Sequence, residues 1–180
     1  MRQQEKHLKQ PSRKPILQAV ISAIMLSLCL MYSTHSFAQN TEAKLDKLSF
    51  TIEGEWSRKI EQQRVIYDDY NLTGKHSKAI VLYHFTTADD PKQFFASAWQ
   101  SIMPDTVAVP RPRRLYTSNS DLIWLSAAAY SLGDQTGYAQ LYVFTKPEGY
   151  QCVLVWLDSF EQYRKTQSQW NIMMQDAKLQ

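Results

Sequence analysis

This sequence predicts an α+β domain, with an antiparallel sheet of about six strands packed with helices, after an N-terminal export signal. Three observations support that prediction. An amphipathic helix pattern lies near the middle of the chain, β-rich runs bounded by turn residues lie on both sides of it, and a second helix pattern ends the chain. We expect the central helix to cover one face of the sheet.

The first 38 residues have the order of a secretory signal peptide. Five basic residues and one acidic residue precede a nearly continuous apolar run over residues 16–31. Ser36-Phe37-Ala38 then places small residues where a signal peptidase needs them, before Gln39. The apolar run is shorter than the roughly 20 residues of a spanning helix, so we expect cleavage rather than an anchor. The expected location is periplasmic or secreted, without a stable membrane anchor once the signal is cleaved.

Removal of the leader changes the charge balance. The full chain has 20 Lys and Arg against 17 Asp and Glu, a net charge of +3, and the leader contributes +4, so the mature chain carries −1. That balance does not favour nucleic acid or a membrane surface as a partner. We divide the chain into a signal peptide (1–38), a flexible N-terminus (39–46) and a single α+β domain (47–180).

The β-rich runs before the helix differ in pattern. Residues 48–52 alternate apolar and polar, as expected for a strand with one buried face. Residues 58–70 are interpreted as a hairpin that breaks near Gln62. Residues 79–86 are apolar on both faces, which predicts an interior strand covered on both sides.

The central helix is predicted over residues 90–103. Asp90 is the expected N-cap, and Pro91 occupies the first helical position, where its missing N–H has no consequence. Pro104 ends the run, because it disfavours helical geometry in the residue before it. One apolar stripe faces the sheet: Phe95, Ala98, Trp99 and Ile102. We interpret these side chains as core rather than ligand contacts.

Further strands and a helix follow a predicted loop over residues 104–114. Residues 122–130 are predicted to be a strand although their alanines favour a helix, because turn residues bound them closely. Residues 138–145 and 150–157 are interpreted as a hairpin. Ser159 and Gln162 are the capping box of a C-terminal helix.

Patterns that carry catalysis or bind metals are few. Outside the leader the chain has two histidines, His76 and His84, and one cysteine, Cys152, which lies in a strand-like run and is expected to be a buried thiol. No metal-ligand spacing, glycine-rich phosphate loop or nucleophile-elbow motif is present, so we expect no cofactor and no metal. His84 is expected to pack within its strand, and the alternative is a base or ligand.

The strongest indication of binding is the segment Pro110-Arg111-Pro112-Arg113-Arg114. Three guanidinium groups on a proline-stiffened loop suit a carboxylate, a phosphate or an acidic protein surface, because arginine offers paired donors and the loop loses little entropy. The alternative is that these arginines pair with acidic residues of their own domain. The candidate binding residues are Arg111, Arg113, Arg114, Tyr116 and His84.

Three stretches carry a resemblance: residues 48–56 (LSFTIEGEW), 79–103 (AIVLYHFTTADDPKQFFASAWQSIM) and 138–178. Their element order and aromatic residues resemble the Mog1/PsbP-like group of small α/β domains. The resemblance implies an α/β/α sandwich, in which helices cover both faces of an antiparallel sheet. It also implies a binding or assembly role. No residue's role is carried over, because the sequence has no functional motif to match.

The sequence therefore favours an exported, non-enzymatic binding or assembly domain for a protein partner or a small anionic ligand. Two alternatives stay open. A small periplasmic hydrolase would use His84 as base and a serine or Cys152 as nucleophile, and it predicts a nucleophile within hydrogen-bond reach of His84. An envelope assembly factor would contact a large complex, and it predicts an exposed apolar or basic patch.

Overall fold

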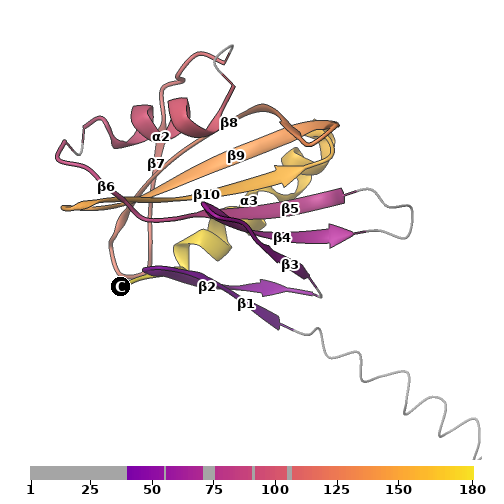
Figure 1. Cartoon of the computed structure of the whole chain (residues 1–180), viewed down its shortest axis with the longest axis horizontal. Helices are drawn as coiled ribbons and strands as arrows, with labels where there is room; N and C mark the ends of the chain where they lie inside the picture. The colour runs from indigo at the N-terminus through magenta and orange to yellow at the C-terminus, as the bar shows by residue number, and fades with distance from the viewer. Residues whose placement is uncertain (1–39, 55, 71–75, 91, 105–106) are drawn as a thin grey trace, which may run out of the picture. The chain divides into compact units, whose positions relative to one another are not determined.

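An antiparallel sheet of eight strands is the largest element of the molecule (Figure 1). The computed structural model describes residues 40–54, 56–70, 76–90, 92–104 and 107–180. The order across the sheet is β3 (Ser57–Ile60), β4 (Arg64–Tyr70), β5 (His76–Tyr83), β10 (Gly149–Leu157), β9 (Gln135–Lys146), β8 (Leu122–Leu132) and β7 (Arg113–Tyr116). The two-residue strand β6 (Thr86–Thr87) pairs with the start of β10.

A second, smaller sheet has the order β1 (Asn40–Leu45), β2 (Leu48–Glu53) and β11 (Lys178–Leu179). β1 and β2 form a hairpin that is paired along its whole length, whereas β11 pairs with β2 only at Leu48 and Ser49. The prediction of a flexible N-terminus over residues 39–46 was therefore wrong for residues 40–45. β1 is mostly polar and has no strand pattern of its own, so its geometry comes from pairing with β2.

Helices cover both faces of the large sheet (Figure 1). α2 (Phe94–Ile102) packs on one face, and α3 (Phe160–Gln175) packs on the other together with the small sheet. The prediction of an antiparallel α+β fold is confirmed. The predicted hairpin over residues 58–70 is formed by β3 and β4. The molecule has more strands than the about six that were predicted, because β1, β6 and β11 are short or mostly polar and have no apolar period of their own. The expected signal peptide lies outside the described residues.

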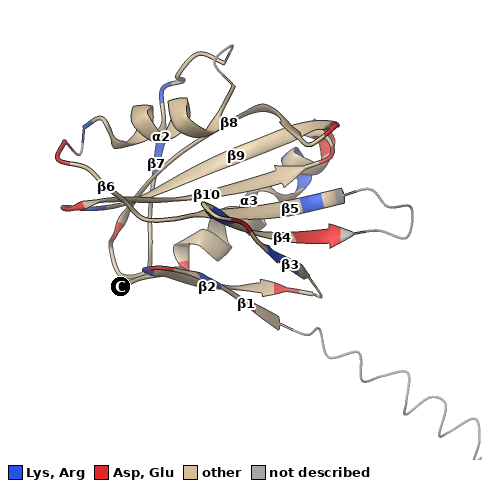
Figure 2. Ribbon diagram, viewed as in Figure 1, with Lys and Arg blue, Asp and Glu red and all other residues tan. Residues whose placement is uncertain are grey.

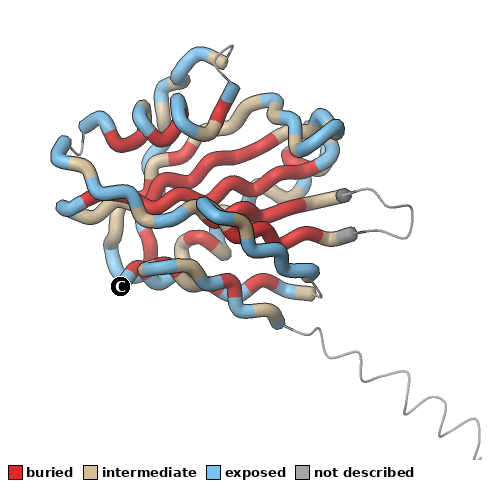
Figure 3. Tube along the Cα trace, viewed as in Figure 1, coloured by how far each residue is buried: buried red, intermediate tan, exposed pale blue. Residues whose placement is uncertain are grey.

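Strand alternation separates two hydrophobic cores. On β10, Val153 and Val155 belong to the core on the α3 side, and Leu154 and Trp156 belong to the core on the α2 side. All nine residues of β10 are buried, and the central strands stand out as the most buried part of the fold (Figure 3). β5 is likewise buried on both faces over residues 79–82, which confirms the prediction of an interior strand.

Helix α2 begins later than predicted. Its N-cap is Gln93 rather than Asp90. The Asp90 carboxylate instead caps the preceding turn, where it accepts hydrogen bonds from the Lys92 backbone N–H and the Gln93 side-chain amide, both at 3.0 Å. Pro91 lies outside the described residues. The predicted stripe does face the core, and the buried side chains of the helix are Phe94, Phe95, Ala98 and Trp99.

The C-terminal half agrees with its prediction. Residues 122–130 lie in a strand, β8, and the expected hairpin is β9 and β10. Ser159 is the N-cap of α3, and its hydroxyl accepts a hydrogen bond from the Gln162 N–H at 3.2 Å. The predicted loop over residues 104–114 was wrong at its end, because Arg113 and Arg114 are the first residues of β7.

The turn of the β1–β2 hairpin is tied to the large sheet. The side-chain amide of Gln151, which is fully buried, donates to the carbonyl oxygens of Leu45 (2.8 Å) and Tyr83 (3.1 Å). Lys47 in the turn forms an ion pair with Glu148 at 2.6 Å. These contacts hold the turn end of the hairpin against the sheet, and the opposite end of β2 is left to border α3.

Candidate functional site

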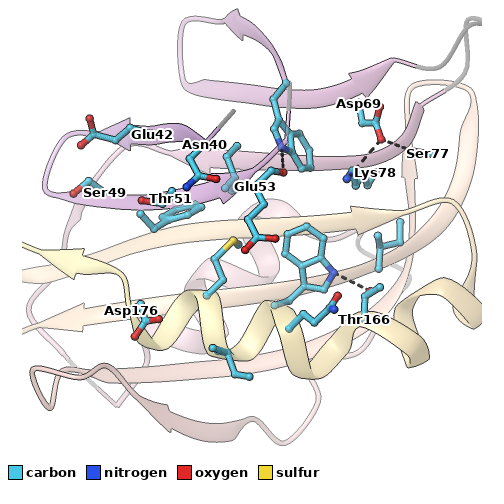
Figure 4. Close-up of a pocket in the computed structure, with 18 of the residues that line it drawn as sticks. Asn40, Glu42, Ser49, Thr51, Glu53, Asp69, Ser77, Lys78, Thr166 and Asp176 are labelled. Carbon is cyan, nitrogen blue, oxygen red and sulfur yellow. Dashed lines mark hydrogen bonds and ion pairs between the residues drawn. The ribbon is translucent and has the colours of Figure 1, made fainter. Parts of the chain in front are cut away.

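A groove of about 1150 Å³ lies between β2 and α3 (Figure 4). The small sheet forms one wall, α3 forms the other, and the start of β5 contributes to one end. The groove exists because the hairpin is held at its turn, and because α3 buries only Tyr163 and Met174 among its sixteen residues. The rest of that helix is left to solvent or to the groove.

Two tryptophans give the groove an apolar surface. Trp56 follows β2 and Trp170 lies on α3, and both are half-buried against the core. The indole N–H of Trp56 donates to the Glu53 carbonyl, and that of Trp170 donates to the Thr166 hydroxyl, each at 2.9 Å. Since both polar atoms are already paired, the remaining exposed surface of each ring is apolar, although Lys78 lies over the Trp56 ring.

Carboxylates outnumber ammonium groups along the groove. The lysines that line it are Lys78 and Lys178, and the acidic residues are Glu42, Glu53, Asp69 and Asp176. Lys78 is already engaged, because its Nζ lies 3.7 Å from the Asp69 carboxylate and 4.7 Å from the centre of the Trp56 ring. Figure 2 shows acidic residues within β2 and at the end of β4. The surplus of negative charge favours a partner that carries Lys or Arg.

A smaller hollow of about 500 Å³ lies beside the β3–β4 turn and the end of α2. Its charges pair with one another, since Arg64 Nε donates to Glu61 Oε2 at 2.6 Å. Hydrogen bonds from Lys59 and Arg64 hold the pKa of Glu61 below its ordinary value. Burial raises the pKa of Tyr83, so this phenol stays protonated. The hollow therefore offers a ligand less than the groove does.

The predicted arginine cluster is divided between two faces. Arg113 and Arg114 are neighbours on β7, and neighbouring side chains of a strand point to opposite sides of the sheet. The Arg114 guanidinium lies 4.8 Å from the centre of the Trp124 ring, on the α2 side. Arg113 pairs with Leu125 of β8, which belongs to the core on the α3 side. With Arg111, which is exposed ahead of the strand, the three groups do not converge on one site.

The other two predicted binding residues also lie apart. Tyr116 is 51% exposed at the end of β7, and His84 follows the end of β5. Three strands, β10, β9 and β8, lie between β5 and β7. At about 4.8 Å per strand this is a separation of roughly 19 Å. The structure therefore does not bring His84 together with the arginine segment.

His84 is exposed and is held by a carboxylate. Its Nδ1 lies 3.0 Å from Oδ2 of Asp46, in the hairpin turn, and the same oxygen accepts a hydrogen bond from the Phe85 N–H at 2.7 Å. The prediction that His84 packs within its strand was wrong, because β5 ends one residue earlier. In the described part of the chain, no hydroxyl or thiol is hydrogen-bonded to this imidazole. These contacts attach the hairpin turn to the large sheet at a further point, and they supply no nucleophile for catalysis.

Cys152 is buried on the α2 side of β10, with 3% of its surface exposed. Burial raises the pKa of its thiol, so the nucleophilic thiolate does not form. Across the ranges that the structure describes, no group of three or more His, Cys, Asp or Glu is placed to hold a metal ion. The reactive groups that a hydrolase would need are therefore not assembled around Cys152.

Few features of the sequence predict the groove. In the sequence, Trp170 shares one helical face with Tyr163 and Met174, which predicts core, and Trp56 lies in a Gly-x-Trp turn. One usable signal was Gln167, which interrupts the apolar face of the C-terminal helix, because an interrupted face predicts incomplete burial. The structure pairs the Gln167 amide with the Tyr163 hydroxyl at 2.6 Å, next to the half-buried Trp170.

Comparison with known proteins gives no family: no family model matches the chain, and no curated protein matches it. Within its described residues, the chain has no helix long and apolar enough to cross a membrane. Function is therefore argued from the groove itself, since a fold alone does not determine function.

Proposed function

We propose that this chain is an exported, non-enzymatic binding or assembly module, and that a partner protein docks in the groove between β2 and α3. The observation that carries the proposal is the pair of half-buried tryptophans, Trp56 and Trp170, in a groove with surplus carboxylates. Tryptophan is a typical anchor of protein interfaces, because it contributes a large rigid contact area. The groove is open and exceeds the roughly 300–1,000 Å³ of small-molecule pockets, which favours a polypeptide segment.

Export and family are parts of the same proposal. The order of charged, apolar and small residues over 1–38 supports a cleaved signal and a periplasmic or secreted protein. The antiparallel sheet with helices on both faces supports membership of the Mog1/PsbP-like group, and that resemblance implies binding or assembly. A small anionic ligand is less well supported, because Arg113 and Arg114 point to opposite faces of β7.

The test is a quantitative capture experiment with residues 39–180, which contain both hydrophobic cores in full. Wild type, Trp170→Ala and Ile60→Ala are immobilised and exposed to an envelope extract of the source organism, and bound proteins are quantified by mass spectrometry. Ile60 is a matched apolar control, because it is 67% exposed on β3 and does not line the groove. We expect a partner that wild type and Ile60→Ala retain and that Trp170→Ala loses.

Other outcomes would overturn the proposal in distinguishable ways. Equal retention by all three proteins would exclude the groove as the docking site. A bound protein or small anion lost only from an Arg111/Arg113/Arg114→Ala variant would move the site to the arginine segment. Turnover of a substrate that His84→Ala abolishes would make the chain an enzyme.

A further inference from the structure

At its first two residues, β2 lies between β1 and β11. From Phe50 onward, β2 is an edge strand. β1 pairs with it over its full length, but β11 pairs only with Leu48 and Ser49. Within the described residues, no strand pairs with that side of β2 from Phe50 to Glu53. The unpaired stretch lines the groove and faces α3. An open edge of this kind is a template for an added strand.

The backbone groups on this edge can be assigned from the ladder. The Lys47 carbonyl accepts from the Gln180 N–H at 2.8 Å, so Lys47 turns its backbone toward β11. Alternate residues of an antiparallel strand turn the same way, which directs the backbone groups of Thr51 and Glu53 to the open edge. The Glu53 carbonyl is occupied by the Trp56 indole N–H. Among the described residues, no backbone group pairs with the Thr51 N–H and C=O or the Glu53 N–H, and an incoming chain could pair with them.

The side chains of β2 at this edge alternate between the core and the solvent. Phe50 and Ile52 are buried toward the core, whereas Thr51 and Glu53 are exposed. A strand added beside β2 has the same alternation, so every second side chain would lie on the side of Phe50 and Ile52 and the others beside Thr51 and the Glu53 carboxylate, with Glu42 one strand further away on β1. Figure 4 shows Glu53 reaching from the end of β2 over the groove.

We propose that the partner protein supplies an extended segment, with alternating apolar and basic residues, that pairs with β2 and adds a strand to the small sheet. This inference rests on the proposed function and names its partner chemistry. Backbone pairing provides affinity in such complexes, and pockets for alternate side chains provide specificity. Because this edge offers three free backbone groups within the described residues, the tryptophans and the carboxylates must supply the rest of the affinity.

Charge favours a separate partner over a second copy of this chain. Two copies paired through β2 would bring the same acidic surplus together, and like charges across a strand pair are unfavourable. The edges of β1, β3 and β7 are also open. β3 and β7 do not line the groove, and the outer edge of β1 is partly occupied, because the Lys44 N–H donates to the Tyr67 hydroxyl at 3.3 Å. The β2 edge combines unpaired backbone groups, the apolar residues Phe50 and Ile52 and the nearby Glu53 carboxylate within the described residues.

The first experiment uses synthetic peptides on residues 39–180. A short peptide of alternating lysine and valine is compared with one of alternating glutamate and valine, with tryptophan fluorescence and fluorescence polarisation as readouts. Two further lysine–valine peptides carry N-methyl groups on the odd or on the even amides. We expect the lysine peptide to bind, the glutamate peptide not to bind, and one methylated peptide to lose about tenfold in affinity while the other does not.

The second experiment changes the edge of the protein. Thr51→Pro removes the N–H that faces the open edge and leaves the ladder to β1 intact, whereas Thr51→Val keeps the backbone and removes only the hydroxyl. We expect at least about a tenfold loss of peptide affinity for Thr51→Pro and a change within about twofold for Thr51→Val. If circular dichroism shows that Thr51→Pro does not fold, the difference in affinity between the two methylated peptides tests strand addition instead.

The results separate this inference from the proposed function. One result would refute strand addition and leave the groove as a docking site. In that result, Trp170→Ala loses peptide binding, whereas N-methylation and Thr51→Pro do not change it. The same holds if no peptide binds while the captured partner is lost from Trp170→Ala. A concentration-dependent dimer of wild type that Thr51→Pro abolishes would replace the partner segment by a second copy and refute the proposal.

Discussion

The helices that cover the two faces of the large sheet bury very different fractions of their residues. On one face, α2 has nine residues and buries four: Phe94, Phe95, Ala98 and Trp99. On the other, α3 has sixteen residues and buries two, Tyr163 and Met174, while the small sheet covers the remaining area. The α2 face is closed by one apolar stripe, and the α3 face is shared by two elements that leave a groove between them.

The difference shows how a fold can separate stability from recognition. A helix whose apolar stripe is complete becomes part of the core and has no surface left for a partner. A longer helix with a narrow buried stripe is held at few points, and its other side chains are available for binding. The ties at the hairpin turn then keep the second wall of the groove in place.

The largest expected effect compares one tryptophan on each face. Trp99 is 1% exposed, so Trp99→Ala removes a fully buried ring and should lower the free energy of unfolding by about 3–5 kcal/mol. Trp170 is half-buried, and Trp170→Ala should lower it by roughly 1–2 kcal/mol. Urea denaturation followed by circular dichroism measures both. Equal losses would mean that the α3 face is as closed as the α2 face.

A smaller effect is expected at the tie between hairpin and sheet. Gln151→Ala removes a donor from the carbonyls of Leu45 and Tyr83 and should lower the free energy of unfolding by about 1–3 kcal/mol. It should also speed hydrogen exchange of the β1 amides. Gln140→Ala is the matched control, because Gln140 is also buried but donates to Asn171 on α3. If both variants speed hydrogen exchange in β1 equally, the hydrogen bonds of Gln151 do not specifically hold the hairpin against the sheet.

The smallest expected effect is the pH dependence of the Lys47–Glu148 pair. A hydrogen bond from Lys47 holds the pKa of Glu148 below its ordinary value. A lowered carboxylate pKa stabilises the folded state above the ordinary glutamate pKa, and this contribution is lost as the pH falls through the lowered value. Glu148→Gln should therefore lower the melting temperature slightly at neutral pH and reduce its fall on acidification. Glu161→Gln, which breaks an ion pair within α3, is the control.

Local patterns were sufficient for the elements that carry the cores. The stripe of α2, the interior strand β5 and the β9–β10 hairpin were predicted because their apolar residues recur with the period of their own secondary structure. The cap of α3 at Ser159 follows from two residues in sequence. These predictions needed no knowledge of distant partners.

Only the tertiary structure decided the rest. β1 and β11 are strands because β2 lies beside them. Asp46, in the hairpin turn, adopts a positive φ of 48°, and its carboxylate contacts the His84 ring. The three arginines were grouped by the sequence and are separated by the alternation of β7. The groove depends on how far β11 extends along β2, which no local pattern encodes. Sequence alone thus determined which apolar stripes form the two cores, and the pairing of distant strands decided which strand edge and which parts of the tryptophan rings stay exposed.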